Sequence, residues 1–148
     1  ANGQSIRFKE KAIRAMGRNA SGVRGMRLKG KDVIVGMDVV EPIQAKNFQL
    51  FIISEEGLGK RTPLVQYRLQ GRGGSGIKTS KVTKKTGQLI GAYVVNAKDE
   101  RDLMVMSTKG QIIRLPFGTV SVFGRATQGV RLMRFKEEGD KVASVTLV

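Results

Sequence analysis

One eight-residue pattern occurs three times in this chain, and it constrains the fold more than any other feature. The pattern is a Gly-Arg pair, a short polar stretch, and a glycine followed by an aliphatic and a basic residue. Its copies occupy residues 17–24, 71–78 and 124–131, at spacings of 54 and 53 residues. Self-similarity at such a period predicts structural units that stack on one another in an array or ring. Two further features recur in step, an upstream glycine (Gly3, Gly57, Gly110) and a closing apolar pair (Val39-Val40, Val94-Val95, Leu147-Val148).

Each full repeat contains four strand-like pieces separated by turn residues, and no segment has a sustained helical period of apolar residues. This pattern predicts an all-β fold built from propeller-like blades of four antiparallel strands. Residues 1–148 then form one domain of three repeats, with repeat 1 lacking its first strand. We expect the open sheet edges to join a larger ring or to pair with a second copy of the chain as a homodimer. The predicted repeats span residues 1–43, 48–95 and 102–148, and the pieces of the third are 103–107, 111–115, 130–135 and 142–148.

The chain is strongly basic, with 27 Lys and Arg against 12 Asp and Glu and a net charge of +15. The basic residues are unevenly placed: residues 57–98 contain nine of them, and residues 103–136 contain six, without any Asp or Glu. A charge that served only solubility would not need this distribution. Stacked repeats would instead place the basic middle of each copy along one edge, which suits the regular phosphates of double-stranded DNA.

The repeated loops have the chemistry of phosphate contacts, because glycine lets the main chain approach closely and arginine presents a planar fork of donors. The alternative is that the loop arginines only pack over a neighbouring blade. Aromatic residues make up 5% of the chain and Trp is absent, so stacking on single strands is disfavoured. The candidate DNA contacts are Arg18, Arg24, Lys60, Arg61, Arg72, Lys78, Arg125 and Arg131.

Catalytic and cofactor chemistry have little support in this sequence. Cys and His are both absent, which removes disulfides, the commonest general base and the commonest metal ligands. Residues 71–76 match G-x-G-x-x-G, but the strand before and the helix after that a dinucleotide site requires are not predicted. We therefore expect no catalytic residue, no metal and no cofactor. With no apolar run near the length of a membrane span, the sequence predicts a cytoplasmic protein.

Dense matches to a known family extend along the whole chain. They include Ile6-Arg7-Phe8, Met16-Gly17-Arg18, Gly22-Val23-Arg24-Gly25, Gly57-Leu58-Gly59-Lys60-Arg61-Thr62-Pro63, Gly73-Gly74-Ser75-Gly76-Ile77-Lys78, Asp102-Leu103-Met104, Ile112-Ile113-Arg114-Leu115 and residues 124–132. In these stretches the chain resembles the C-terminal domain of DNA gyrase A and its close relative in topoisomerase IV.

The resemblance implies a β-pinwheel, usually of six blades, of which these would be the last three. It implies a non-sequence-specific module that binds, bends and wraps duplex DNA on a basic rim and supports negative supercoiling by a type II DNA topoisomerase. The module would not be an enzyme by itself, since the catalytic tyrosine and the ATPase lie outside it. Its partners would be the remainder of gyrase A together with the gyrase B protein. Two alternatives stay open: a topoisomerase IV domain that recognises DNA crossings, and a protein–protein scaffold of propeller type.

The gyrase family also carries a defining heptapeptide, Q-R-R-G-G-K-G. The nearest match here has Gly71 where an arginine is expected and Ser75 where the lysine is expected. The resemblance therefore implies a degenerate copy of the heptapeptide in a later blade. This box-like loop consists of Gln70, Gly71, Arg72, Gly73, Gly74, Ser75 and Gly76.

Overall fold

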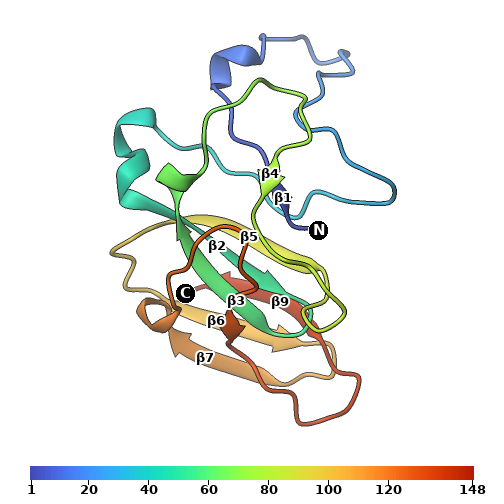
Figure 1. Ribbon diagram of the computed structural model, residues 1–148, viewed down its shortest axis with the longest axis vertical. Helices are drawn as coiled ribbons and strands as arrows, with labels where there is room; N and C mark the ends of the chain where they lie inside the picture. The colour runs from blue at the N-terminus through green and yellow to red at the C-terminus, as the bar shows by residue number, and fades with distance from the viewer.

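The computed structural model describes residues 1–148, apart from the side chains of Pro42 and Gln44. Antiparallel strands and short 3-10 turns make up its regular structure, as predicted for an all-β chain (Figure 1). The strands are β1 (Gln4–Ser5), β2 (Phe48–Ser54), β3 (Leu58–Pro63), β4 (Ile77–Lys78), β5 (Leu89–Asn96), β6 (Asp102–Ser107), β7 (Ile112–Pro116), β8 (Val130–Arg131) and β9 (Val142–Leu147). The 3-10 turns are η1 (Glu10–Ala12), η2 (Pro42–Asn47), η3 (Leu64–Gln66) and η4 (Phe117–Thr119).

The strands form three sheets. The orders are β1-β4, β5-β2-β3-β8 and β7-β6-β9. Within repeats 2 and 3 the first strand is central: β2 pairs with β3 and β5, and β6 pairs with β7 and β9. These two sheets therefore have the same internal arrangement, as the sequence repeat requires.

The third strand of each repeat joins the sheet of the repeat before it. β8 belongs to repeat 3 but pairs with β3 of repeat 2, and β4 of repeat 2 pairs with β1 of repeat 1. The four-stranded blade is thus present in repeat 2, but its fourth strand comes from repeat 3. The third of the four strand-like pieces predicted for a repeat thus pairs with the preceding repeat rather than with its own.

A glycine with positive φ anchors each exchanged strand. The carbonyl of Gly57 (φ 74°) accepts hydrogen bonds from Leu132 N (2.8 Å) and Met133 N (3.2 Å) just after β8. A Cβ at residue 57 would lie 2.7 Å from the carbonyl oxygen of Met133, so only glycine fits there. Gly3 (φ 79°) bonds Thr79 N and Ser80 N in the same way after β4.

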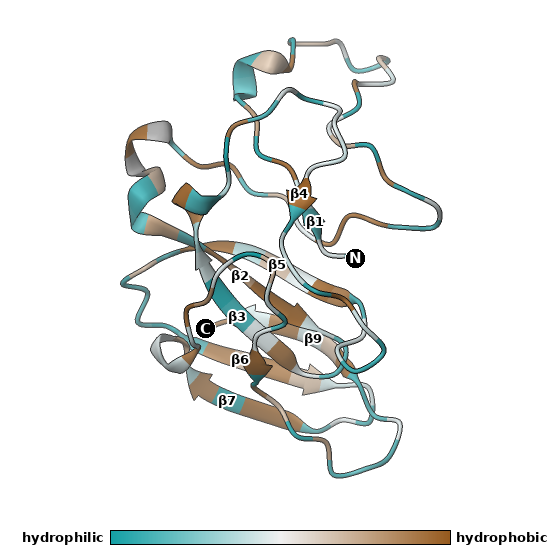
Figure 2. Ribbon diagram, in the orientation of Figure 1, coloured by the Kyte–Doolittle hydropathy of each residue, from teal (hydrophilic) through white to brown (hydrophobic). Residues whose placement is uncertain are grey.

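The main hydrophobic core lies between the sheets of repeats 2 and 3, where Figure 2 shows the most apolar strands. Phe51 of β2 meets Phe117 of η4 edge to face, with ring centroids 5.3 Å apart. Burial of each such side chain contributes about 1.5–3 kcal/mol to the free energy of folding. The core consists of Phe51, Ile53, Val95, Leu103, Val105, Phe117, Val120, Met133 and Val142.

Repeat 1 is open by comparison. Residues 33–40 correspond to β5 and β9, yet they form no strand, and no strand of repeat 1 corresponds to β2 or β6. Ile34 is 61% exposed, whereas Leu89 and Val142, at the same place in the other repeats, are 6% and 3% exposed.

Candidate nucleic-acid interface

The Gly-Arg loops of repeats 2 and 3 each lie against the preceding repeat, and two of the backbone hydrogen bonds that hold them recur at both junctions. At the first junction Gln70 N donates to Arg7 O, and at the second Phe123 N donates to Arg61 O, both at 2.8 Å. On the far side of the loops, Arg27 N donates to Gly74 O (2.8 Å) and Lys81 N donates to Thr127 O (3.4 Å). The repeat in sequence is therefore also a repeat in how neighbouring units join. We call these contacts junction 1–2 and junction 2–3.

The loop arginines bind the carbonyl of an equivalent basic residue in the repeat before. Arg72 Nη1 donates to Arg24 O at 2.7 Å, and Arg125 Nη1 donates to Lys78 O at 3.3 Å. Packing over a neighbouring repeat, one of the two roles considered for these arginines, is thus observed for both. It also sets two candidate pairs side by side, Arg24 with Arg72 and Lys78 with Arg125.

Three candidate side chains occupy equivalent positions of the repeat, and two of them, Arg24 and Lys78, stand beside a loop arginine of the next repeat. Arg24, Lys78 and Arg131 each follow the aliphatic residue of the repeated pattern, and all three are exposed. No hydrogen bond or ion pair engages their side-chain nitrogens in the described part of the chain. Arg18, from the loop of repeat 1, is exposed as well. These four cations can meet a polyanion without first breaking an internal contact.

Lys60 was predicted to contact DNA from the surface, and this prediction is wrong. Its side chain is buried, with 0% of the residue exposed, and it reaches under the next loop. Nζ donates to Gly124 O (2.6 Å), to Thr127 Oγ1 (3.0 Å) and to the carbonyl of Arg125. Burial, together with the charge of Arg125, lowers the pKa of Lys60 to about 8. The ammonium therefore holds the 124–127 loop from inside, because three donors on a flexible stem match three converging acceptors.

Arg61 is also buried, at 8% exposure, and does not face solvent as predicted. Its Nε donates to Val120 O (2.7 Å), its Nη2 donates to Gly118 O (3.0 Å), and the guanidinium lies 5.3 Å from the centre of the Phe117 ring. Burial lowers the pKa of this group. These contacts tie β3 to η4 of the next repeat.

Arg7 makes the corresponding contact at junction 1–2, and sequence reasoning missed it. Its Nη1 donates to Leu64 O (3.3 Å) and Tyr67 O (3.2 Å) around η3. The third member of the series, Arg114, instead pairs with Asp102 at 2.6 Å. The signal was available, because Arg7, Arg61 and Arg114 each stand four residues after the recurrent glycine.

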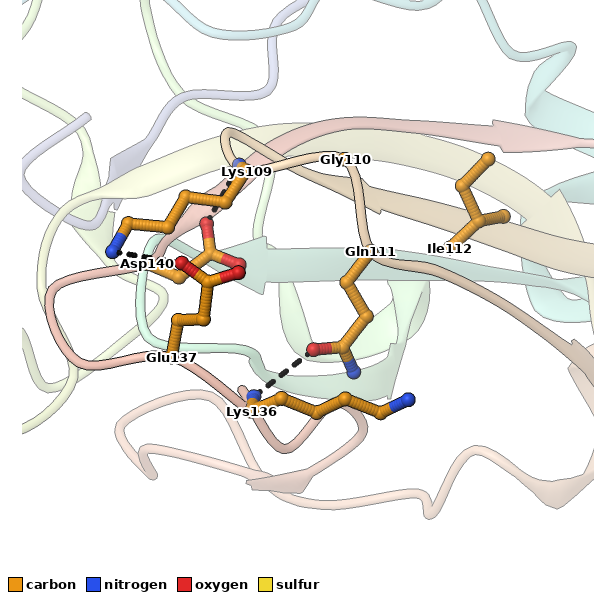
Figure 3. A pocket seen from close by; sticks show the side chains of 7 residues that line it. All are labelled: Lys109, Gly110, Gln111, Ile112, Lys136, Glu137 and Asp140. Carbon is orange, nitrogen blue, oxygen red and sulfur yellow. Dashed lines mark hydrogen bonds and ion pairs between the residues drawn. The ribbon is translucent and has the colours of Figure 1, made fainter.

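A polar hollow of about 370 Å³ at the tip of the β6–β7 hairpin holds the best-bonded carboxylate (Figure 3). Asp140 accepts hydrogen bonds from Ser107 Oγ (2.5 Å), Thr108 Oγ1 (2.8 Å), Lys109 N (3.0 Å) and Lys141 N (2.9 Å). Burial alone would raise the pKa of Asp140, but these donors lower it to about 2. The carboxylate is fully used in holding the turn and is not free for proton transfer.

Two further features bear on the motifs considered in the sequence. Among the described residues, no cluster of three or more acidic side chains could hold a metal ion. The 71–76 loop follows η3 rather than a buried strand and leads into the two-residue β4 rather than a helix, so it is no dinucleotide-binding turn. No helix in the described part of the chain is long and apolar enough to cross a bilayer.

Comparison with known proteins places these repeats in a family. The family model of the DNA gyrase C-terminal domain, a beta-propeller, matches residues 1–41, 49–96 and 101–148. The DNA gyrase A protein of Staphylococcus epidermidis (strain ATCC 12228) is 41% identical over 148 residues, which cover 100% of this chain and 16% of that protein. Its counterpart in Staphylococcus aureus (strain MRSA252) is 41% identical over 133 residues, 90% of this chain and 15% of that protein. The chain thus spans about one sixth of the curated relatives it matches.

Two solved structures share the fold. The C-terminal domain of DNA gyrase A superposes with a TM-score of 0.81 at 26% identity, over 99% of this chain and 47% of that one. The C-terminal domain of DNA topoisomerase IV gives 0.87 at 24% identity, over 99% and 44%. The strand exchange and the repeated junctions therefore belong to pinwheel blades, and the chain is a member of the DNA gyrase A C-terminal domain family.

Proposed function

We propose that this chain binds double-stranded DNA through the exposed cations of its repeat junctions and bends the duplex along them. The observation that carries the proposal is the repetition of one arrangement. An exposed basic side chain stands beside the loop arginine at both junctions, Arg24 with Arg72 and Lys78 with Arg125. Arg18 and Arg131 continue the series at either end.

Electrostatics support a polyanion as the ligand. The net charge is +15, and the described residues contain few ion pairs that would neutralise the basic ones. Cations spaced by a structural repeat can follow a backbone whose phosphates are also regular. Smooth bending of a 20–30 bp site costs on the order of 1–6 kcal/mol, which contacts at successive junctions would offset.

Buried Lys60 and Arg61 have a different role in this proposal. They place the 124–127 loop and η4 relative to repeat 2, and so set where Arg125 stands. We therefore propose six phosphate contacts rather than the eight predicted. They are Arg18, Arg24, Arg72, Lys78, Arg125 and Arg131.

Family membership supplies the context for this binding. In the cell we propose a cytoplasmic accessory role, in which the chain presents bent DNA to the remainder of gyrase A and to the gyrase B protein, and so supports negative supercoiling. Chemistry would reside in those other parts. The box-like loop contributes Arg72 and its backbone, while Gly71 and Ser75 lack the side chains of the family heptapeptide.

The test is the salt dependence of duplex binding. A duplex of about 30 bp is titrated between about 50 and 200 mM salt, with wild type and with the triple variant Arg24→Gln, Lys78→Gln, Arg131→Gln. We expect the triple variant to lower the slope of log K against log salt by about 2–3, since each lost phosphate contact removes about 0.9. The matched control, Lys84→Gln, Lys85→Gln, Lys98→Gln, removes the same charge away from the junctions.

Two results would contradict the proposal. Equal slopes for the triple variant and the control would show that DNA binding depends on the net charge alone and not on the positions of these cations. Binding without salt dependence would favour a protein scaffold instead. A change in the linking number of relaxed circles on binding separates DNA wrapping from the recognition of crossings.

A further inference from the structure

A basic hollow of about 410 Å³ lies between η1 of repeat 1 and the start of the box-like loop in repeat 2. Three of the side chains that line it are cationic: Lys9, Lys11 and Arg72. None is acidic, although Glu10 stands between the two lysines in sequence. The lining residues are Lys9, Lys11, Ala12, Leu69, Gln70, Gly71 and Arg72.

The two lysines have no internal partner that would compete with a ligand. Lys9 and Lys11 are both exposed, and neither forms a hydrogen bond or an ion pair through Nζ among the described side chains. Their charges are therefore available to an anion at the cost of little more than side-chain ordering.

Arg72, in contrast, is held in place. Its Nε donates to Ala12 O (3.0 Å) and its Nη1 donates to Arg24 O (2.7 Å), which fixes the guanidinium plane beside the hollow. The guanidinium has further N–H donors that these two bonds leave free. A fixed fork with spare donors is suited to phosphate oxygens, because little conformational entropy is lost when they bind.

Gln70 adds a donor that lacks a partner. Its backbone N–H is bonded to Arg7 O, so the residue is anchored at the junction. The side-chain Nε2 is buried and makes no hydrogen bond to any described residue. The nitrogen is also closed off from solvent, so Gln70 forms part of the wall of the hollow rather than an open donor in it.

The same place at junction 2–3 has a different character. Lys9 and Lys11 correspond to Pro63 and Val65, and Gln70 corresponds to Phe123. Val65 is 63% exposed and Phe123 37% exposed. The arginine is common to both junctions, but the two lysines and the amide belong to the first alone, so the hollow is not a by-product of the repeat.

We infer that the hollow formed by Lys9, Lys11, Gln70 and Arg72 is a phosphate-binding site that takes one or two phosphodiester groups of duplex DNA. The inference rests on the proposed function and adds to it a fixed anchoring point at junction 1–2. Two ammonium groups supply charge and the arginine fork supplies direction, while Gln70 lines the hollow beside them and can report on binding.

The first test compares two double variants with equal loss of charge. Lys9→Gln with Lys11→Gln removes the hollow's lysines, and Lys84→Gln with Lys85→Gln removes two exposed lysines from the turn before β5. For the first we expect about tenfold weaker duplex binding near 100 mM salt and a slope of log K against log salt smaller by about 1–2. The control should lose much less. Equal losses in the two variants would overturn the site.

The second test reads the site directly. In amide NMR spectra, the side-chain NH₂ signal of Gln70 should shift when the wild-type chain is titrated with inorganic phosphate or with the duplex. In the Lys9→Gln, Lys11→Gln variant the shift should be lost, while thermal unfolding stays unchanged. An unmoved Gln70 signal with both probes overturns the inference.

The two probes also separate this inference from the proposed function. A phosphate-induced shift with no binding of the duplex would keep the anion site and refute DNA binding. Salt-dependent duplex binding without any shift of the Gln70 signal would keep DNA binding and refute the anion site.

Discussion

The two junctions share one backbone arrangement but hold their loops by different side chains. At junction 2–3 the ammonium of Lys60 bonds three acceptors of the 124–127 loop from below. At junction 1–2 the same position is Ile6, whose Cδ1 lies 3.6 Å from where a Cβ of Gly74 would stand. The loop there is tied by Arg72, which donates to Ala12 O in addition to the contact that it shares with Arg125.

This difference also changes which side chains the two junctions expose. Junction 2–3 uses its lysine internally and exposes Val65, Val122 and Phe123 on the outside. Junction 1–2 keeps an apolar residue inside and exposes Lys9 and Lys11. The shared backbone bonds thus place the two loops alike, whereas the side chains that hold each loop, and those exposed beside it, differ between the junctions.

The largest expected effect comes from the arginine clamps. Arg61→Met removes two hydrogen bonds from a buried guanidinium and leaves the carbonyls of Gly118 and Val120 unpaired, so we expect a loss of about 3 kcal/mol in the free energy of unfolding. Arg7 is the equivalent residue at junction 1–2, but it is only partly buried and its hydrogen bonds are longer. Arg7→Met should therefore lower the free energy of unfolding by only about 1 kcal/mol. Urea unfolding measures both. Equal costs would show that the two junctions contribute alike to stability.

Lys60→Met is the next test of the comparison. Methionine fills a similar volume but cannot satisfy the acceptors at Gly124, Arg125 and Thr127, so we expect a loss of about 2 kcal/mol and faster amide exchange in the 124–127 loop. The matched change at junction 1–2, Ile6→Met, should cost less than about 1.5 kcal/mol and leave exchange there unchanged. A Lys60→Met chain as stable as wild type would mean that the ammonium contributes nothing.

A pH effect follows from the same lysine. Its pKa is about 8 in the folded chain, against an ordinary value of 10.5. Between these values the unfolded chain binds more protons, so the free energy of unfolding should rise with pH across this window. We expect wild type to gain about 1–2 kcal/mol over Lys60→Met from about pH 8 to about pH 10. A flat difference between the two chains would contradict a depressed pKa.

The smallest effect should come from giving junction 2–3 the charge of junction 1–2. Val65 is exposed and occupies the position of Lys11, so Val65→Lys should fold normally. We expect duplex affinity to rise several-fold and the salt slope to increase by about 0.9. Val65→Gln is the neutral control. If the lysine has no effect, DNA does not pass this part of junction 2–3.

Much of this architecture could be predicted from the spacing of Gly57 and Gly110 and the apolar pieces that follow, because glycine-marked turns and short β-branched runs are local signals. The exchange of β4 and β8 could not, since two-residue strands carry no pattern that selects a partner. Lys60 and Arg61 were placed on the surface because Lys and Arg are rarely buried. Their burial is possible because carbonyl groups of the neighbouring repeat accept their hydrogen bonds, and the sequence does not show that these groups lie close by.

The candidate site was predictable in part for the same reason. Arg24, Lys78 and Arg131 recur at one position of the pattern, and the structure exposes all three. The hollow around Lys9 and Lys11 could not be predicted, because it joins η1 to a loop of the next repeat, and the two meet only across a junction.

The central claim is that equivalent cations of successive repeats face one duplex. The chain has no cysteine, so Arg24→Cys, Lys78→Cys and Arg131→Cys can each carry a single photo-crosslinker, with Lys98→Cys in the β5–β6 connection as control. The account predicts strong crosslinks to a bound duplex from positions 24, 78 and 131 and weak ones from position 98. Crosslinking confined to one of the three, or equally strong from position 98, would contradict it.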